Sequence, residues 1–219
     1  MAVVDDTGHF LGFIPPPRTL AVLLWEHEED LARLGGFQHN ALAARQASLA
    51  RVGRRFLQRM PWLLLGLVGA MAAAALVGSF EEQLQRNVLI AFFLPGIVYM
   101  ADAVGTQTET LLIRGLSVGV TIRRVAGREL LTGVLVGATV AAAFYPLAFW
   151  IWGSADVALA AALSLLAACS TATLVAMALP YLFTQLGMDP AFGSGPLGTV
   201  VQDLLSILIY LVVSSALLR

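Results

Sequence analysis

Five long apolar segments follow one another along the last three-quarters of the chain. They span residues 61–80, 88–113, 130–152, 157–183 and 197–218. A helix needs about 20 mainly apolar residues to cross the hydrocarbon core of a bilayer, and each segment reaches that length. A soluble protein with five buried helices would instead need a polar face on most of them. The pattern therefore predicts an all-α, polytopic membrane protein with five transmembrane helices.

The composition agrees with this interpretation. The chain has 219 residues, of which 58% are hydrophobic and 12% charged, and its mean hydropathy is +0.82. A soluble domain carries about 25% charged residues. The net charge of −1 gives no support to nucleic-acid binding. The first residues lack the apolar run behind a basic start that marks a signal peptide. We therefore expect a short soluble N-terminal part and a membrane domain embedded in the lipid bilayer.

The arginines predict how the segments are oriented. All thirteen basic residues are arginine, and seven of them precede residue 60. The loop after the first segment carries only Arg86, whereas the second segment is followed by Arg114, Arg123, Arg124 and Arg128. Cytoplasmic loops collect arginine. The N-terminus is therefore expected in the cytoplasm, in a multi-pass protein of the cell (inner) membrane.

The last apolar segment contains one acidic residue, Asp203, and no basic residue or histidine before its end. Ionisable residues inside a bilayer usually face a cavity, a partner or a substrate path. Gln202 precedes this aspartate, and Ser206 lies one turn later on the same side of a helix. A structural hydrogen bond to a neighbouring helix would explain Asp203, and so would a cation site. We favour the cation site.

The second apolar segment also carries polar residues. Asp102 lies between Pro95 and Gly105, both of which weaken a helix. Irregular backbone at this depth is tolerated only where it lines a cavity. Thr106 and Gln107 add neutral oxygen atoms. Mg²⁺ prefers oxygen ligands, keeps several waters and meets few carboxylates, so this segment suits a path for a hydrated divalent cation.

Two further acidic residues have two interpretations each. Glu109 could contact an ion directly, but an ion pair with Arg114 near the inner interface is the favoured interpretation. Asp189 lies in a Gly- and Pro-rich loop over residues 185–198, directly before Pro190. An aspartate there serves well as a turn or N-cap residue, and it could equally bind a cation at the cytoplasmic surface.

The residue inventory argues against an enzyme. The three histidines all precede the first apolar segment, and the single cysteine, Cys169, lies in an apolar run. A Ser–His dyad or a His-ligated zinc site cannot form in the membrane from this set. A non-conducting accessory subunit would explain small-residue runs such as "GAMAAAALVG", which favour close helix packing. It would leave Asp102 and Asp203 without a role.

Four motifs, in this order, resemble one known family. They are "RRFLQRMPWLLLGLVGA", "GSFEEQL", "LPGIVYMADAVGTQTETLLIRGLSVG" and "GMDPAFGSGPLGTVVQDLLSILIYL". Together they cover roughly residues 54–219 and resemble the membrane domain of the MgtE family of magnesium channels and transporters, which is related to a family of solute carriers. The resemblance implies a channel or transporter for divalent cations, with Mg²⁺ as the expected ion and no enzymatic activity.

The resemblance also implies an assembly and a site. Members form a homodimer whose second and fifth helices line one central pore, where paired Asp203 residues would hold a hydrated Mg²⁺. Asp189 would help bind a regulatory Mg²⁺ near the cytoplasmic mouth, and Glu82 would attract cations from an outer acidic loop. Asp102 would add a further metal-binding carboxylate. The remaining expected pore-lining residues are Gly105, Thr106, Gln107, Thr199, Gln202 and Ser206.

The sequence departs from the family pattern in two places. Asp102 and Ala103 stand where the family has Gly-Asn, which is compatible with tighter cation binding, with a preference for another divalent metal, or with export coupled to protons or Na⁺. At the N-terminus, "VVDDTGHFLGFI" and "WEHEEDLARLGG" resemble the last strand pair of a CBS domain and the helix after it. The sequence does not contain a complete CBS pair, so the family's Mg²⁺-sensing gate is not carried over.

Three regions are therefore expected. Residues 1–37 form a truncated CBS-like cytoplasmic remnant, residues 38–60 an amphipathic connecting helix, and residues 61–219 the five-helix membrane domain. The basic helix over 38–60 would either link a sensor to the pore or lie on anionic lipid.

Overall fold

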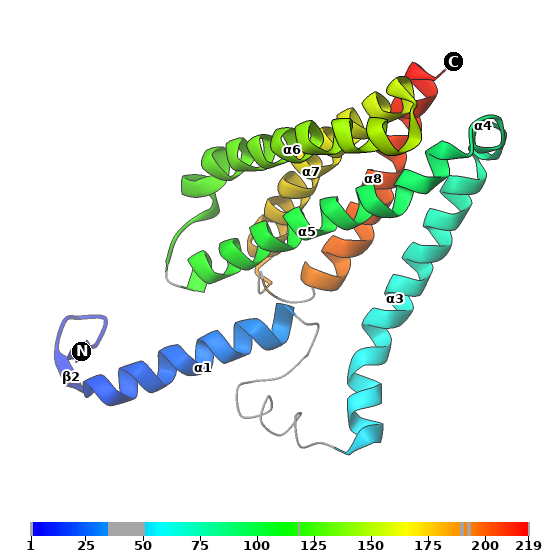
Figure 1. The fold of residues 1–219 in the computed structure, drawn as a ribbon. Helices are drawn as coiled ribbons and strands as arrows, with labels where there is room; N and C mark the ends of the chain where they lie inside the picture. Colours follow the sequence, from blue (N-terminus) through cyan, green and yellow to red (C-terminus); the bar gives the residue numbers. More distant parts are fainter. Residues whose placement is uncertain (1, 35–50, 118, 189–190, 192–193, 219) are drawn as a thin grey trace.

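The structure, a computed structural model, describes residues 2–34, 51–117, 119–188, 191 and 194–218 (Figure 1). Five helices in this part are long and apolar enough to cross a membrane. They are α3 (Val52–Gly78), α5 (Leu89–Ser117), α6 (Ile122–Trp152), α7 (Ala155–Gln185) and α8 (Ser194–Leu217). The prediction of an all-α chain with five membrane-spanning helices is confirmed.

Two helices begin earlier than the apolar pattern predicts. α3 begins at Val52 rather than at residue 61, and α6 begins at Ile122 rather than at residue 130. Both added stretches carry arginines, which suit the headgroup layer of a bilayer. α5 also differs from expectation, because it continues without interruption past Pro95 and through Gly105. The prediction of irregular backbone in this segment was therefore wrong.

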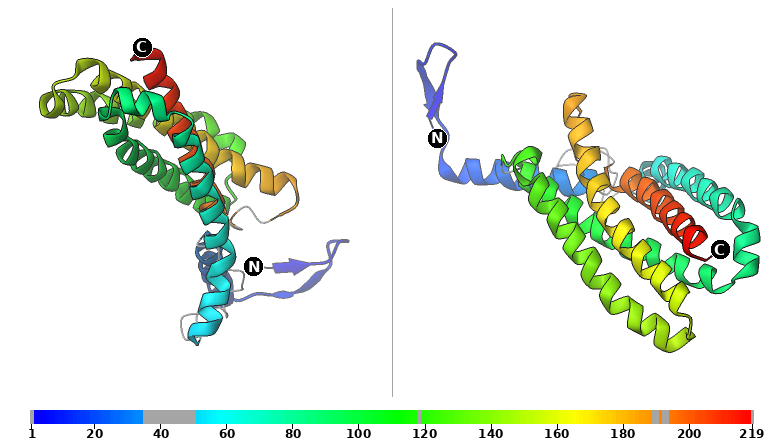
Figure 2. Two further views of the ribbon diagram at one scale, coloured as in Figure 1. Left: turned by 90° about the vertical axis from the view of Figure 1, so that its right-hand side faces the viewer. Right: turned by 90° about the horizontal axis from the view of Figure 1, so that it is seen from above.

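α7 lies at the centre of the bundle and packs against α5, α6 and α8 (Figure 2). Small side chains let these helices approach closely, as is common between helices in a membrane. The buried alanines of α7 include Ala158, Ala161, Ala168 and Ala172. On α6, Gly133 lies against Thr173 of α7, where a Cβ would meet the threonine side chain at 2.7 Å or less. This packing fixes the scaffold on which α5 and α8 are held.

α3 differs from the other long helices because it packs almost only on α8. Gly69 of α3 makes the closest approach: a Cβ at that position would come within 3.0 Å of a methyl group of Val200. The remaining surface of α3 stays exposed, and Figure 1 shows it standing to one side of the bundle. Its exposed side chains include Leu63, Leu64, Leu67, Val68 and Met71.

Short elements connect and precede the long helices. α4 (Glu81–Arg86) follows α3 and was not predicted. The C-terminal end of α7 is capped by Gly187, which has φ +70°. Next to it, the Met188 N–H donates a hydrogen bond to the Phe183 carbonyl at 2.9 Å. This pattern is a Schellman motif, in which glycine tolerates the left-handed conformation. The predicted tight turn therefore begins directly after α7.

The N-terminal part contains an antiparallel strand pair, β1 (Ala2–Val4) and β2 (Phe10–Phe13), followed by α1 (Pro16–Leu34). Asp5 organises the turn by accepting hydrogen bonds from the hydroxyl of Thr7 at 2.7 Å and the N–H of His9 at 2.8 Å. These donors, the Thr7 hydroxyl above all, lower the pKa of Asp5. Of the predicted connecting helix over 38–60, residues 38–50 lie outside the described part, and residues from 52 onward belong to α3.

Candidate ion-binding site

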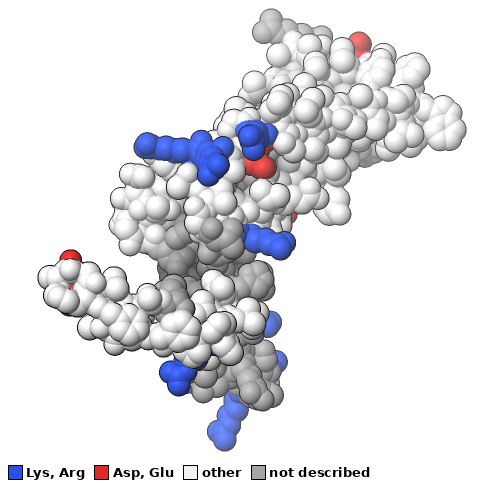
Figure 3. All heavy atoms as spheres, turned by 90° about the vertical axis from the view of Figure 1, so that its left-hand side faces the viewer, with Lys and Arg blue, Asp and Glu red and all other residues white. Residues whose placement is uncertain are grey.

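α5 and α8 pack against each other in opposite directions and carry three acidic residues, Asp102, Glu109 and Asp203. We call the end where α5 ends and α8 begins the basic end, because the helix ends and loop there hold Arg114, Arg123, Arg124 and Arg128. On the face shown in Figure 3, blue side chains lie at the middle and at the bottom of the molecule, and the upper right end shows none. The polar residues of α5 and α8 therefore lie between a basic end and a second end that holds α4.

Asp102 of α5 and Asp203 of α8 line the same groove, which has a volume of about 400 Å³. Thr199 of α8 lines it as well. The rest of the wall is apolar and comes from α3, α5 and α8: Val77, Leu94, Pro95, Val98, Tyr99 and Ile207. The structure thus brings together two of the four predicted metal-binding carboxylates and one predicted pore-lining hydroxyl.

A second hollow of about 270 Å³ adjoins this groove, because Thr199 and Asp203 line both. Its other walls come mainly from α3, including Trp62, Gly66, Gly69 and Ala70. The glycines and alanines of α3 leave room beside Asp203. The Asp203 carboxylate therefore faces two connected spaces at the contact between α3 and α8.

The electrostatics of the groove favour a cation. Asp102 and Asp203 are close enough to repel each other, and no arginine is among the described residues that line the groove. One oxygen of Asp102, Oδ1, is buried and has no hydrogen-bond partner. Two carboxylates in apolar surroundings are costly without a positive companion. A cation in the groove would offset both charges.

In the described part of the chain, no three His, Cys, Asp or Glu residues are grouped so that they could hold a metal ion. A site that strips all water from its ion is therefore not built by these residues. Mg²⁺ commonly keeps several waters and uses one or two carboxylates. The groove, with Asp102, Thr199 and Asp203, suits an ion that keeps part of its hydration shell.

The other predicted pore-lining residues fall into two groups. Gln202 and Ser206 are 3% and 2% exposed, and with Gly105 they lie inside the α5–α8 contact rather than in the groove wall. Thr106 and Gln107 are exposed on α5 and do not line the groove. The structure therefore separates a set that faces the groove from a set that is packed between the helices.

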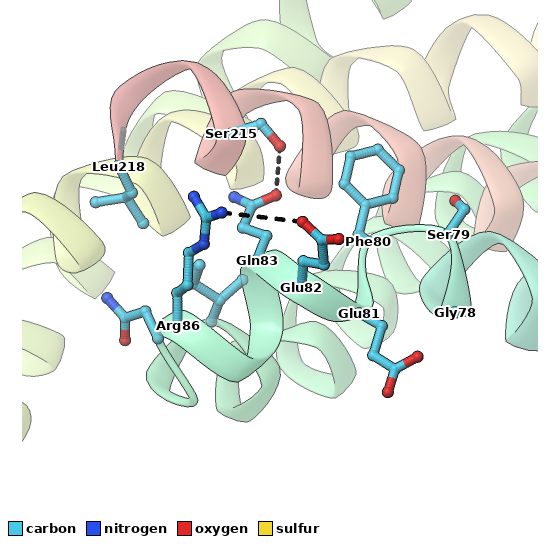
Figure 4. A pocket seen from close by; sticks show the side chains of 11 residues that line it. Gly78, Ser79, Phe80, Glu81, Glu82, Gln83, Arg86, Ser215 and Leu218 are labelled. Carbon is cyan, nitrogen blue, oxygen red and sulfur yellow. Dashed lines mark hydrogen bonds and ion pairs between the residues drawn. The ribbon is translucent and has the colours of Figure 1, made fainter.

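Glu82 lies on α4, in a different hollow of about 550 Å³ (Figure 4). Its side chain is 93% exposed, and one of its carboxylate oxygens lies 3.9 Å from Arg86. In the same hollow, the Ser215 hydroxyl of α8 donates to the Gln83 side-chain oxygen. Glu82 is therefore not brought to the groove by Asp203. Asp189, the remaining predicted metal-binding residue, lies outside the described residues.

Sequence reasoning missed the position of Glu109. Its side chain is 6% exposed, and the Ser194 hydroxyl at the start of α8 lies within hydrogen-bonding reach of its carboxylate. Its polar neighbours among the described residues are Ser194, Asp102 and Gln202. Arg114 is not among the groups that act on its carboxylate, so the favoured pairing with Arg114 was wrong. Glu109 follows Gly105 by four residues, and this spacing places both on one face of α5.

Comparison with known proteins gives a consistent result. The MgtE family profile, described as "Divalent cation transporter", matches residues 94–213. Over nearly the whole chain, the sequence is 30% identical to proteins named "Magnesium transporter MgtE" from Bacillus subtilis (99% of this chain, 48% of the relative) and Thermus thermophilus (100% and 49%). It is 27% identical to a protein of that name from Enterococcus faecalis, over 99% of this chain and 48% of the relative.

The chain spans about half the length of the relatives it matches. The family profile, however, covers α7 completely and most of α5 and α8, the two helices that hold the acidic groove. With five membrane-spanning helices and two carboxylates facing one groove, the chain belongs to the MgtE family of divalent cation transporters and is not an enzyme.

Proposed function

We propose that this chain carries hydrated divalent cations, Mg²⁺ first among them, through a path on which Asp203 holds the ion. One observation carries the proposal: Asp102 and Asp203 face a single groove, and the part of its lining that the structure describes holds no arginine. The chain's membership of a divalent cation transporter family and the names of its relatives support Mg²⁺ as the ion. The groove combines carboxylate and hydroxyl oxygens, which hard divalent cations prefer.

The conducting unit proposed is a homodimer with one central path lined by α5 and α8. Asp203 is only half-buried, and the surface of α3 beside it is largely exposed and apolar. Lipid could cover that surface, but a single chain then brings only two carboxylates to the ion. A two-fold axis beside the groove would place a second Asp203 opposite the first. The ion would then sit between four carboxylates with its remaining waters.

Asp102 supports a second candidate within the same class of function. It adds a carboxylate where the family resemblance leads one to expect a neutral residue. An additional carboxylate strengthens the attraction for any hard divalent cation, and Mn²⁺ and Ca²⁺ use the same oxygen ligands as Mg²⁺. The candidate is a transporter that favours a divalent metal other than Mg²⁺. Coupling to protons or Na⁺ at Asp102 is the other form of this candidate.

The remaining assignments extend the same proposal. The N-terminus and the basic end lie in the cytoplasm, because arginine collects on that side of the cell (inner) membrane. Residues 1–37 are a CBS-like remnant, 38–60 a connecting segment and 61–219 the membrane domain. Asp189 binds a regulatory Mg²⁺ at the cytoplasmic mouth, and Glu82 attracts cations at the outer surface, where its side chain is 93% exposed.

Ion flux into liposomes tests the proposal. The purified chain should admit Mg²⁺, detected by an enclosed indicator, and Asp203→Asn should abolish this flux. Asp156→Asn is the matched control, because Asp156 is an exposed aspartate in the first turn of α7 and lies in neither hollow beside Asp203. Undiminished flux through the Asp203→Asn protein would refute the role of the groove.

A further inference from the structure

Among the described residues, three buried carboxylate or amide oxygen atoms of α5 and α8 have no hydrogen-bond donor. They are Oδ1 of Asp102, Oε1 of Glu109 and Oε1 of Gln202. Buried polar atoms almost always have a partner, and leaving one unpaired is costly, above all when the group is charged. All three atoms are acceptors, so each lacks the same kind of partner: a hydrogen-bond donor or a cation.

These acceptors lie along one line. Asp102, Gly105 and Glu109 follow one another at spacings of three and four residues, which places them on one face of α5. Gln202 of α8 lies over Gly105, where a Cβ would meet its Oε1 atom first and would come within 2.6 Å of its Nε2 atom. Along the helix, Glu109 lies about 10 Å from Asp102 toward the basic end.

Gly198 of α8 places Glu109 and Gln202 next to each other. A Cβ built at Gly198 would lie 3.8 Å from Oε2 of Glu109 and 3.7 Å from Nε2 of Gln202. Both side chains are more than nine-tenths buried, being 6% and 3% exposed. Each still has its Oε1 atom unpaired. Glycine at 105 and 198 thus leaves room for the Gln202 amide inside the helix contact, with the Glu109 carboxylate beside it at Gly198.

Glu109 packs against the start of α8. Its carboxylate lies at the first turn of α8, beside Ser194, where the unpaired N–H groups of a helix carry partial positive charge. One oxygen is directed toward this turn, and the other is left unpaired. A buried carboxylate with an unpaired oxygen, close to a buried amide whose oxygen is also unpaired, is an arrangement that a cation can complete.

We propose that Glu109 and Gln202 form a second station for the transported divalent cation, between the Asp203 groove and the basic end. This inference rests on the proposed function and adds a second binding step to it. Their two Oε1 atoms would ligate the ion, and water would complete its shell, as divalent cations with few carboxylate ligands allow. Two weaker sites in series let an ion leave as well as bind.

Binding of Mn²⁺ to the purified full chain, measured by electron paramagnetic resonance, tests the station apart from transport. Asp203→Asn removes the groove site, and a Mn²⁺ site that Mg²⁺ displaces should remain. Adding Glu109→Gln, which keeps the shape of the side chain, should lower the affinity of this site for Mn²⁺ by at least about tenfold. Even the loss of a hydrogen-bond partner of a metal ligand commonly lowers metal affinity by that factor. Glu129→Gln on α6 is the matched control and should leave binding unchanged.

Equal Mn²⁺ affinity with and without Glu109→Gln would overturn the proposal, and would indicate a protonated Glu109 that donates to Gln202. Anomalous diffraction from Mn²⁺-soaked crystals of the unaltered chain would show directly where the ion binds, without the use of any variant. Density between the two Oε1 atoms supports the station, and density confined to Asp203 overturns it. If the unaltered chain shows no flux but Glu109-dependent binding persists, only the proposed function fails.

Discussion

Gln202 of α8 packs directly onto Gly105 of α5, in space that any other side chain would occupy. The contact holds the α5–α8 pair together one residue away from Asp203. Because Gln202 and Asp203 are consecutive, their side chains point about 100° apart around α8. One faces α5 and the other faces the groove, so packing between the helices sets the direction of the carboxylate.

Gly105→Ala should therefore disturb both stability and ion binding. The new methyl group would push Gln202 aside, and overpacking of this kind costs about 1–3 kcal/mol. We expect a lower melting temperature in detergent and weaker Mg²⁺ protection against melting. Gly96→Ala on the same helix is the matched control, because a Cβ at Gly96 meets nothing within 4 Å. Equal melting behaviour of the two variants would contradict the close contact.

Asp102→Asn should change the choice of metal more than the fold. The substitution keeps the size of the side chain and removes one of the two charges in the groove. We expect the ratio of Mg²⁺ to Mn²⁺ flux in liposomes to shift, with an unchanged melting temperature. Asp156→Asn, at the exposed start of α7, should shift neither. A metal profile identical to that of the unaltered chain would assign Asp102 a structural role.

Particles in mild detergent should contain two chains. The chain has a mass of 23.2 kDa, so native mass spectrometry should give about twice this value for the transport-competent form. An active particle with one chain would exclude paired Asp203 residues.

Gly69→Leu should reduce flux, because the larger side chain at the α3–α8 contact would collide with Val200 and push α3 away from α8.

Tyr210→Phe should lower stability and leave transport intact. The Tyr210 side chain is fully buried, and its hydroxyl donates to the Ile90 carbonyl at 2.8 Å, which ties α8 to the start of α5. Loss of one such bond costs about 1 kcal/mol. Denaturant titration should detect the loss, whereas Tyr145→Phe, at a 37% exposed side chain, should have no effect. A large fall in flux at equal protein content would contradict a purely structural role.

The hairpin of β1 and β2 should loosen in acid. The donors of Thr7 and His9 lower the pKa of Asp5 in the folded hairpin. The contribution of Asp5 to the stability of the hairpin is therefore complete above the unfolded pKa of about 3.9, and it is lost as the pH falls through the folded pKa. Amide hydrogen exchange over residues 5–9 should report this change, after correction for the intrinsic effect of pH. Asp5→Ala should show fast exchange even at neutral pH, while Asp6→Ala should not.

The five membrane helices could be predicted because spanning a bilayer imposes a length and an apolar composition on any sequence. The early start of α6 at Ile122 could not, because hydropathy detects only the part of a helix inside the hydrocarbon. α4 was not predicted for a related reason, because "EEQLQR" is short and has no apolar face. Pro95 led to the opposite error, because proline was expected to interrupt the helix. It lies within the second turn of α5, and the helix continues past it.

The site was predictable in its residue types and less so in its geometry. Asp102 and Asp203 stood out as carboxylates in apolar segments, and they do share a groove. Which face of α8 meets α5 was not readable, because membrane helices are apolar on every side and carry little periodic signal. Glu109 was assigned to Arg114, yet five residues turn a helix by about 500°, which leaves the two side chains about 140° apart.

The isolated position of α3 has a mechanical consequence. α5, α6 and α8 are all joined through α7, while α3 rests on α8 and forms one wall beside Asp203. A tilt of α3 would therefore widen or narrow the space at this carboxylate without breaking the contacts that hold the other four helices together. α3 begins at Val52, directly after residue 51, so a force transmitted along the preceding part of the chain would act on this one helix and change the width of the space beside Asp203.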